Sequence, residues 1–217
     1  LVLFIPFANS CTNSSKSSFN KVCQEVQSPC LQGNALVHLT TTKGNVTLEL
    51  YGKAAPVTAG NFVDLIKRGV YEGTIFHRVV KHPVPFVIQG GDPLSKNPKT
   101  PFYDYGTGNF INPLTGEARF IPLEIKLRDE QIPSYGELIT LPKDLLRVEL
   151  THRKGSIAMA RARTANSGSA QFYIALRSLP ELDGRYAVFG RVTKGLKVIE
   201  AIENGDKILK TYADFVN

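Results

Sequence analysis

The amino-acid sequence predicts a mainly β protein whose antiparallel strands close into a barrel covered by two α-helices. Strand-like segments bounded by turn residues recur along the chain, whereas only two segments have the spacing of amphipathic helices. The 217 residues are 42% hydrophobic and 21% charged, which suffices for one core but not for two large domains. A closed barrel fits these observations because it leaves no strand edge unpaired.

The N-terminal part of the fold is predicted to be a β-hairpin followed by a helix. Apolar and polar residues alternate across 35–51, with a turn at TKGN. The apolar positions proposed for this hairpin are Leu36, His38, Val46, Leu48 and Leu50. The helix begins at Pro56 and ends before Gly69, because proline suits a first helical turn and glycine a C-terminal end. Its apolar residues at helical spacing are Ala59, Phe62, Val63 and Ile66.

The remaining strands lie on both sides of a long irregular segment. Further strands are predicted at 74–80, 85–90, 155–162, 170–176, 186–192 and 207–215, with a second helix near 194–204. Residues 93–150 contain seven prolines and one clear strand, RFIPLEIK at 119–126. We therefore expect one domain over 35–217 with an insertion at about 93–150, which could be a substrate-selecting flap, a docking surface or a loop without function.

The N-terminus is typical of an exported protein. The apolar LVLFIPF is followed by ANSC at 8–11, which resembles the end of a bacterial lipoprotein signal and would make Cys11 the lipidated residue. An ordinary cleaved signal peptide, or a stretch foreign to the protein, is the alternative. The apolar run is too short to span a bilayer, so contact with a membrane is expected only through a lipid on Cys11.

A polar segment and two further cysteines follow the apolar run. Residues 12–34 are rich in serine, asparagine and glutamine, which predicts a flexible linker. Cys23 and Cys30 lie seven positions apart and could form a disulfide in an oxidising compartment; the alternative is two free thiols in a mobile tail.

Charge and motif spacing exclude several other functions. The net charge of +7 comes from scattered lysine and arginine, so we favour solvated strand faces over nucleic-acid binding. The histidines at 38, 77, 82 and 152 lack metal-ligand spacing. A GxSxG elbow and a glycine-rich phosphate loop are both missing from the sequence, and we expect no cofactor.

Five motifs together resemble one enzyme family. IFHRVV, PFVIQGGD, SIAMA, SAQFYI and LDGRYAVFGRV, in this order, are similar to the cyclophilin-type peptidyl-prolyl cis-trans isomerases over residues 36–92 and 153–217. The resemblance implies an eight-stranded antiparallel β-barrel capped by two helices, with a proline-binding groove on its outer face. A monomer that acts on proline-containing polypeptides is expected, and the export-type N-terminus favours the periplasm or cell envelope, with a thylakoid lumen as the alternative.

The chemistry of this reaction explains why an arginine would stand within a strand. Rotation about a peptide bond is opposed by a barrier of about 18–20 kcal/mol, because the nitrogen lone pair is delocalised into the carbonyl. In the twisted state the prolyl nitrogen regains that lone pair, so a fixed cationic donor stabilises this state selectively. Arg78 is the candidate donor. The resemblance adds Phe86 as the floor of the proline pocket and Gln89 as an amide that orients the substrate or the arginine.

The resemblance also assigns the substrate-binding positions. Val87, Tyr173 and Leu182 match walls of the proline pocket, and Gln171 is a second amide. Ala160 and Arg161 match the strand that pairs with the residues before proline, where Arg161 is expected to keep the pairing and add charge. Gly106 matches the groove edge, and Tyr186 replaces a common histidine as a donor to a substrate carbonyl. The full set is Val87, Gly106, Ala160, Arg161, Gln171, Tyr173, Leu182 and Tyr186.

Two matters stay open. Glu181 stands where many members carry the tryptophan linked to strong cyclosporin binding, so weakened binding of that inhibitor is expected. The alternative function is a chaperone or scaffold that holds proline-containing segments with little turnover; the presence of Arg78, Phe86 and Gln89 favours the enzyme.

Overall fold

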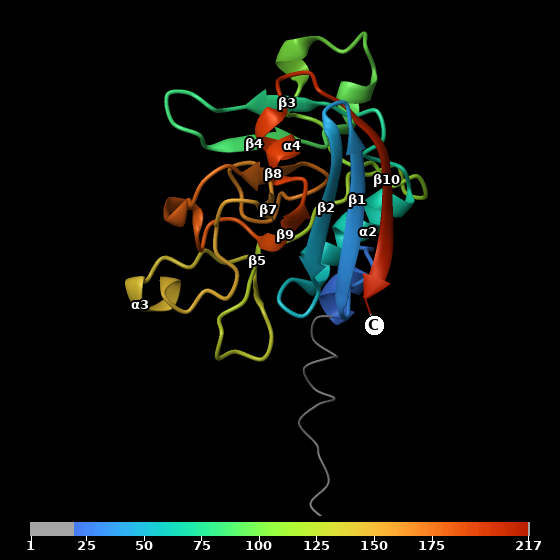
Figure 1. Ribbon diagram of the computed structural model, residues 1–217. Helices are drawn as coiled ribbons and strands as arrows, with labels where there is room; N and C mark the ends of the chain where they lie inside the picture. Colours follow the sequence, from blue (N-terminus) through green and yellow to red (C-terminus); the bar gives the residue numbers. More distant parts are fainter. Residues whose placement is uncertain (1–19, 217) are drawn as a thin grey trace, which may run out of the picture.

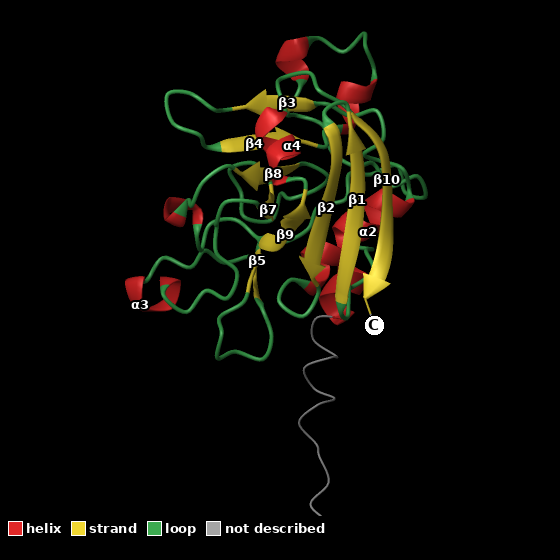
Figure 2. Ribbon diagram, viewed as in Figure 1, coloured by secondary structure: helices red, strands yellow, loops and turns green. Residues whose placement is uncertain are grey.

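The computed structural model describes residues 20–216, in which eight antiparallel strands form one curved sheet (Figure 1, Figure 2). The strand order is β10-β1-β2-β9-β7-β8-β4-β3. The strands are β1 (Asn34–Thr41), β2 (Gly44–Tyr51), β3 (Phe76–Val79), β4 (Val87–Gly90), β7 (Ser156–Met159), β8 (Phe172–Ala175), β9 (Val188–Lys194) and β10 (Ile208–Val216). The predicted mainly β, eight-stranded antiparallel architecture is therefore confirmed.

The sheet closes less completely than the sequence predicted. Its two edge strands, β3 and β10, are joined by an isolated bridge between Ile75 and Lys207 rather than by a continuous ladder. Four backbone hydrogen bonds surround this bridge: Phe76 N donates to Asp206 O at 2.8 Å, Gly205 N to Phe76 O at 3.0 Å, Ile208 N to Thr74 O at 2.9 Å and Gly73 N to Ile208 O at 2.8 Å. The result is a half-barrel in which most of the ladder bonds lie between the other strands.

The β1–β2 hairpin forms as predicted, but one face of β1 was misassigned. Val37 and Leu39 are buried in the core, whereas Leu36 and His38 on the alternate face are only partly buried. The predicted positions on β2, which are Val46, Leu48 and Leu50, are all buried. Because a strand has a period of two residues, choosing Leu36 instead of Val37 inverts the predicted face of β1.

Helix α2 (Pro56–Lys67) lies inside the curve of the sheet and is buried over eleven of its twelve residues. Phe62 of this helix contacts Tyr71, Phe172 and Phe189, with ring centroids 4.8, 5.3 and 5.1 Å apart. This aromatic cluster is the centre of the main core. The second predicted helix, α4 (Leu196–Ala201), is shorter and packs near β2.

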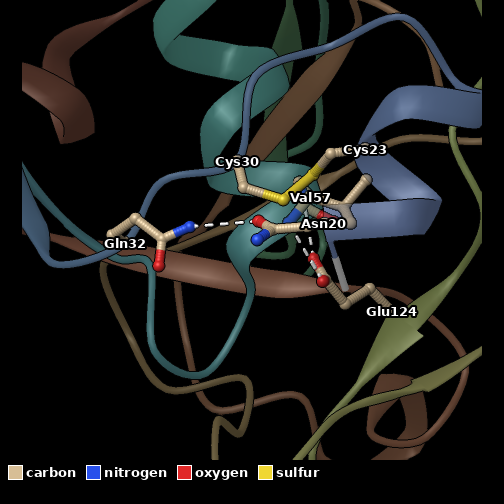
Figure 3. The surroundings of a disulfide bond; sticks show 7 residues. Asn20, Cys23, Cys30, Gln32, Val57 and Glu124 are labelled. Carbon is tan, nitrogen blue, oxygen red and sulfur yellow. Dashed lines mark hydrogen bonds between the residues drawn. A yellow bond between two sulfur atoms is a disulfide. The ribbon is translucent and has the colours of Figure 1, made fainter. Parts of the chain in front are cut away.

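The segment before β1 is folded, which corrects the expectation of a flexible linker over residues 20–34. Residues 20–25 are helical, and Cys23 and Leu31 are buried in the main core. Cys23 and Cys30 form a disulfide, so the paired alternative is confirmed (Figure 3). Leu31 N also donates to Pro56 O at 3.0 Å, which holds this segment against the start of α2. The lipidation predicted at Cys11 lies outside the described residues.

The insertion is partly built into the core. It contains β5 (Glu124–Ile125), β6 (Ser134–Tyr135), α3 (Pro142–Leu145) and the short 3-10 helices η1 (Pro93–Lys96) and η2 (Phe102–Asp104). The predicted strand at 119–126 shrinks to β5, but its apolar residues Ile121, Leu123 and Ile125 join the main core.

A carboxylate from the insertion also caps α2. Glu124 accepts hydrogen bonds from Val57 N at 3.0 Å and Thr58 N at 2.8 Å, where the helix dipole favours negative charge (Figure 3). Burial raises the pKa of Glu124, and the two backbone donors oppose that rise.

In the described part of the chain, no helix combines the length and the apolar character that crossing a membrane requires.

Candidate active site

The register of four strands brings predicted site residues into one row. Arg78 on β3 pairs with Gln89 on β4, which pairs in turn with Tyr173 on β8. Tyr173 then pairs with Ala158 on β7. Residues paired directly across a sheet project from the same face, so this row lies on the outer face, opposite the core residues that alternate with it.

A hollow of about 260 Å³ lies over this row, and we call it the slot. Its base is a second buried apolar cluster, separate from the main core, that includes Val87, Tyr173 and Val188. Every residue lining the slot belongs to the set predicted from the sequence: Arg78, Phe86, Val87, Gln89, Ala160, Arg161, Tyr173, Leu182 and Tyr186.

A second hollow of about 430 Å³, the side pocket, adjoins the slot and shares Gln89, Ala160 and Arg161 with it. It contains the two remaining predicted residues, Gly106 and Gln171. Its other lining residues were missed by sequence reasoning: Thr107, Asn109, Phe120, Ala162, Ser167 and Ser169. Phe120 belongs to the insertion, whose sequence lacks any motif that would have placed it beside the groove.

Arg78 is an unengaged donor at the mouth of the slot. It is exposed at the second-last position of β3, and its guanidinium carbon lies 5.8 Å from the centre of the Phe86 ring. Among the described residues, none forms a hydrogen bond or ion pair with the Arg78 guanidinium. The N–H groups are therefore available to a molecule that enters the slot. His77 beside it is buried, because successive residues of a strand face opposite sides of the sheet.

Two glutamines and an aspartate fix the boundary between the hollows. Gln89 Nε2 donates to Gln171 Oε1 at 3.1 Å, and Gln171 Nε2 donates to Gly108 O at 2.9 Å. Asp92 is fully buried and accepts hydrogen bonds from Gly106 N at 2.6 Å and Gly108 N at 3.3 Å. A Cβ at Gly108 would lie 2.0 Å from Asp92 Oδ1, so only glycine permits this approach. Asp92 therefore fixes the loop that carries Gly106 and Gly108 at the edge of the side pocket.

The structure corrects the expected placement of Ala160 and Arg161. Strand β7 ends at Met159, so both residues lie just beyond the ladder, although Ala160 N still donates to Gln171 O at 2.9 Å. Arg161 does not extend a free charge into the groove. Its guanidinium donates to Arg185 O, at 2.8 and 3.0 Å, and lies 4.7 Å from the centre of the Tyr186 ring.

Sequence reasoning also missed a buried polar chain behind the slot. Tyr173 Oη lies 2.9 Å from His152 Nε2, and His152 Nδ1 lies 2.7 Å from Asp183 Oδ1. Burial raises the pKa of the Tyr173 hydroxyl well above its usual value, so the hydroxyl remains protonated. In the sequence, His152 belongs to none of the five motifs, so no local signal predicts this chain. The described residues contain no cluster of histidine, cysteine and carboxylate side chains that could hold a metal ion.

Glu181 lies beside this site without lining it. The side chain is exposed and forms an ion pair with Arg177 at 2.8 Å, within the turn that contains the 3-10 helix η3 (Pro180–Leu182). Leu182, the next residue, does line the slot.

Comparisons with known proteins agree with this geometry. The model of the family described as cyclophilin type peptidyl-prolyl cis-trans isomerase/CLD matches residues 36–214. A Synechocystis protein, provisionally named as a thylakoid lumen peptidyl-prolyl cis-trans isomerase, is 39% identical over 83% of this chain. This chain spans only 47% of that relative's length. A peptidyl-prolyl cis-trans isomerase of Helicobacter pylori is 34% identical over 85% of this chain and 90% of its own length.

A solved structure is similar in fold. The crystal structure of a cyclophilin type peptidyl-prolyl cis-trans isomerase from Cryptosporidium parvum, determined in the presence of the dipeptide Ala-Pro, has a TM-score of 0.60. The two chains are 26% identical, and the match covers 83% of this chain and 99% of the other. Together with the family match over residues 36–214 and the register that assembles the motif residues, this shows that the chain belongs to the cyclophilin-type peptidyl-prolyl cis-trans isomerase family.

Proposed function

We propose that this protein catalyses cis–trans isomerisation of Xaa-Pro bonds in polypeptides, with the slot as its proline site. The observation that carries this proposal is the unengaged Arg78 guanidinium at the mouth of an apolar hollow built on Val87, Tyr173 and Leu182. A prolyl ring is apolar and compact, and burying it in the slot brings its nitrogen within reach of Arg78. Family membership supports the same assignment.

The reaction requires neither a covalent bond nor a proton transfer. As the Xaa-Pro bond twists, the prolyl nitrogen becomes pyramidal, and Arg78 donates to the lone pair that appears only in this state. Phe86, which packs beside Arg78, limits the freedom of the guanidinium and forms part of the apolar wall. Since each tenfold gain in rate requires about 1.36 kcal/mol, a small number of preorganised contacts is sufficient.

The groove positions the peptide on both sides of the proline. In this proposal, backbone groups of Ala160 and Arg161, which lie beyond the end of β7 and line the slot, pair with residues before the proline. Gln89 and Gln171 hold the substrate backbone where the slot meets the side pocket. Tyr186 donates to a substrate carbonyl from the opposite wall, and Gly106 forms the groove edge.

We further propose that the protein works outside the cytoplasm. A disulfide between Cys23 and Cys30 persists in oxidising compartments, and the provisional name of the Synechocystis relative points to a thylakoid lumen. Tethering by a lipid on Cys11 and weakened cyclosporin binding caused by Glu181 belong to the same proposal. Mass spectrometry of the mature protein purified from its native membranes tests the lipid directly.

The test of catalysis is NMR exchange between the cis and trans signals of a short Xaa-Pro peptide. We expect the wild-type protein to broaden these signals at catalytic amounts. Arg78→Ala should lower kcat/KM about 10²–10³-fold, the loss typical of removing one preorganised donor. Arg78→Lys should recover little, because a lysine lacks the rigid multi-donor fork.

Arg128→Ala is the matched control, since Arg128 is also exposed but lies in the insertion away from both hollows. Its activity should equal that of the wild type. If the wild-type protein binds the peptide without accelerating exchange, the enzyme proposal is wrong and the alternative of a proline-binding chaperone or scaffold replaces it.

A further inference from the structure

The buried hydrogen-bonded chain behind the slot joins two elements, β8 and the end of η3, that both contribute residues to the lining of the slot. Tyr173 lies on β8, and its hydroxyl contacts His152 Nε2 at 2.9 Å. Asp183 follows Leu182 at the end of η3, and its Oδ1 contacts His152 Nδ1 at 2.7 Å. His152 itself is 1% exposed and comes from the segment before β7. A single imidazole therefore connects three separate parts of the chain directly beneath the slot.

The partners of His152 define the direction of both hydrogen bonds. Asp183 Oδ1 also accepts a hydrogen bond from His152 N at 2.7 Å, so Asp183 is the acceptor at its end of the hydrogen-bonded chain. Nδ1 therefore donates to Asp183, and in the tautomer that has its proton on Nδ1, Nε2 accepts from the Tyr173 hydroxyl. The hydroxyl is thereby satisfied from behind the slot, and the Tyr173 ring can present an apolar face to its interior.

The packing of the His152, Tyr173 and Tyr186 rings also restrains Tyr173, which lines the slot. The His152 and Tyr173 rings are nearly parallel, with centroids 5.9 Å apart and an interplanar angle of 11°. The Tyr173 ring meets Tyr186 edge to face, with centroids 5.7 Å apart at 84°. A rotation of Tyr173 would therefore break its hydrogen bond to His152 and change its contact with Tyr186 together.

We propose that His152 is a positioning residue of the slot, which fixes the Tyr173 ring against the turn that carries Leu182 and Tyr186. This inference rests on the proposed function, because it concerns the binding of the prolyl ring in the same slot. His152 acts through Tyr173 and Asp183 without touching the peptide. Its removal should weaken peptide binding and leave the donor Arg78, and hence the chemical step, largely unaffected.

The test measures KM and kcat for the Xaa-Pro peptide by NMR line shapes over a range of concentrations, and the peptide Kd by chemical-shift titration. His152→Leu should raise KM and Kd about tenfold, because it leaves the buried Tyr173 hydroxyl without its partner and removes one of the two donors to Asp183 Oδ1, the backbone N–H of residue 152 being kept. Its kcat should stay within about twofold of the wild type. His152→Gln keeps an acceptor near Nε2 and His152→Asn keeps a donor near Nδ1, so each should recover part of the affinity.

A double variant separates positioning from general stability. His152→Leu combined with Tyr173→Phe removes both the imidazole and the hydroxyl that it bonds. Because no buried hydroxyl is then left without a partner, the double variant should bind the peptide more tightly than His152→Leu alone. His38→Leu is the control, since His38 also bonds a neighbouring side chain, Thr47, at 3.3 Å but lies on β1 outside both hollows. It should leave KM and Kd unchanged.

Two results would overturn the proposal: a folded His152→Leu protein with wild-type KM and Kd, or a loss of kcat without a change in KM. If His152→Leu does not fold, Gln and Asn variants that bind the peptide as tightly as the wild type would overturn it instead. A wild-type protein without turnover would refute the proposed function, and the Kd series would still decide the role of His152.

Discussion

Arg161 shows how a residue in a motif can have a role that the motif does not specify. The sequence predicted that it would add charge to the groove. In the structure, its guanidinium donates to the carbonyls of Arg185, Ala162 and Arg163 and lies over the Tyr186 ring. Four of its five N–H groups are used in this way. Arg161 therefore links the segment after β7 to the turn that positions Tyr186.

We predict that Arg161→Ala lowers kcat/KM about fivefold to tenfold, because Tyr186 loses its cation–π contact and the segment after β7 loses its link to Arg185. Arg161→Lys should recover little, since an ammonium group cannot reproduce several planar hydrogen bonds at once. The measurement is peptide exchange by NMR. Arg163→Ala is the control, because Arg163 is exposed nearby and lines neither hollow. Equal losses in both variants would point to net charge instead of positioning.

The residues of the site were predictable because they lie in motifs shared with the family, and all eleven predicted positions line the slot or the side pocket. Strand register itself places four of them, Arg78, Val87, Gln89 and Tyr173, whereas the other seven lie in the segments between the strands. His152 and Phe120 were missed for a physical reason. Each comes from an irregular segment, and its location depends on long-range packing that local sequence patterns do not encode.

At the scale of elements, the insertion consists of two parts with different environments. Ile121, Leu123 and Val148 are buried in the main core, and Arg119 forms a buried ion pair with Asp64 at 2.7 Å. In contrast, Leu146 beside α3 is 79% exposed. The sequence identified the apolar pattern of 119–126 but interpreted it as a full strand, because alternation does not show that pairing is limited to the two residues of β5 and an isolated bridge from Ile121 to Gly168.

We predict that these two parts respond differently to substitution. Ile121→Ala should cost about 2–5 kcal/mol, the usual range for truncating a buried isoleucine, and lower Tm by roughly 5–15 °C in a chain of this size. Leu146→Gln should stay within about 0.5 kcal/mol of the wild type, as exposed substitutions usually do. Thermal unfolding followed by circular dichroism measures both. If Ile121→Ala keeps the wild-type Tm, the insertion does not contribute to the stability of the core.

At the scale of the whole molecule, the sequence predicted the strand content better than the closure of the sheet. The strands of the main sheet and the two helices that turn signals and periodicity predicted are present, and the main sheet has the eight strands that the family resemblance implied. Closure depends on how the distant edge strands β3 and β10 meet, which periodicity cannot reveal. Residues 20–34 were predicted to be flexible because their composition is polar; the disulfide and the burial of Leu31 outweigh that composition.

Asp206 lies where β3 meets the segment before β10, so its contacts affect the closure of the whole half-barrel. Its carboxylate accepts hydrogen bonds from Thr42 Oγ1 and Glu203 N, both at 2.7 Å, and lies 3.6 Å from Lys43 Nζ. Its backbone carbonyl accepts the hydrogen bond from Phe76 that joins β3 to the C-terminal segment. Burial opposes ionisation of Asp206, but the hydrogen bonds and the charge of Lys43 outweigh it and lower its pKa below the ordinary 3.8.

We therefore predict that Asp206→Asn destabilises the closure in a pH-dependent way. A carboxyl group with a lowered pKa stabilises the folded state above its unfolded pKa, and this stabilisation is lost as the pH falls through the folded pKa. The variant should lose about 1–2 kcal/mol at neutral pH, and its difference from the wild type should narrow below about pH 4. The amides of Phe76 and Ile208 should exchange faster, whereas those of β7 and β8 should not change. Asp214→Asn is the control, because Asp214 is 64% exposed on β10. If the closure amides keep their wild-type protection while Tm falls, Asp206 acts elsewhere in the fold.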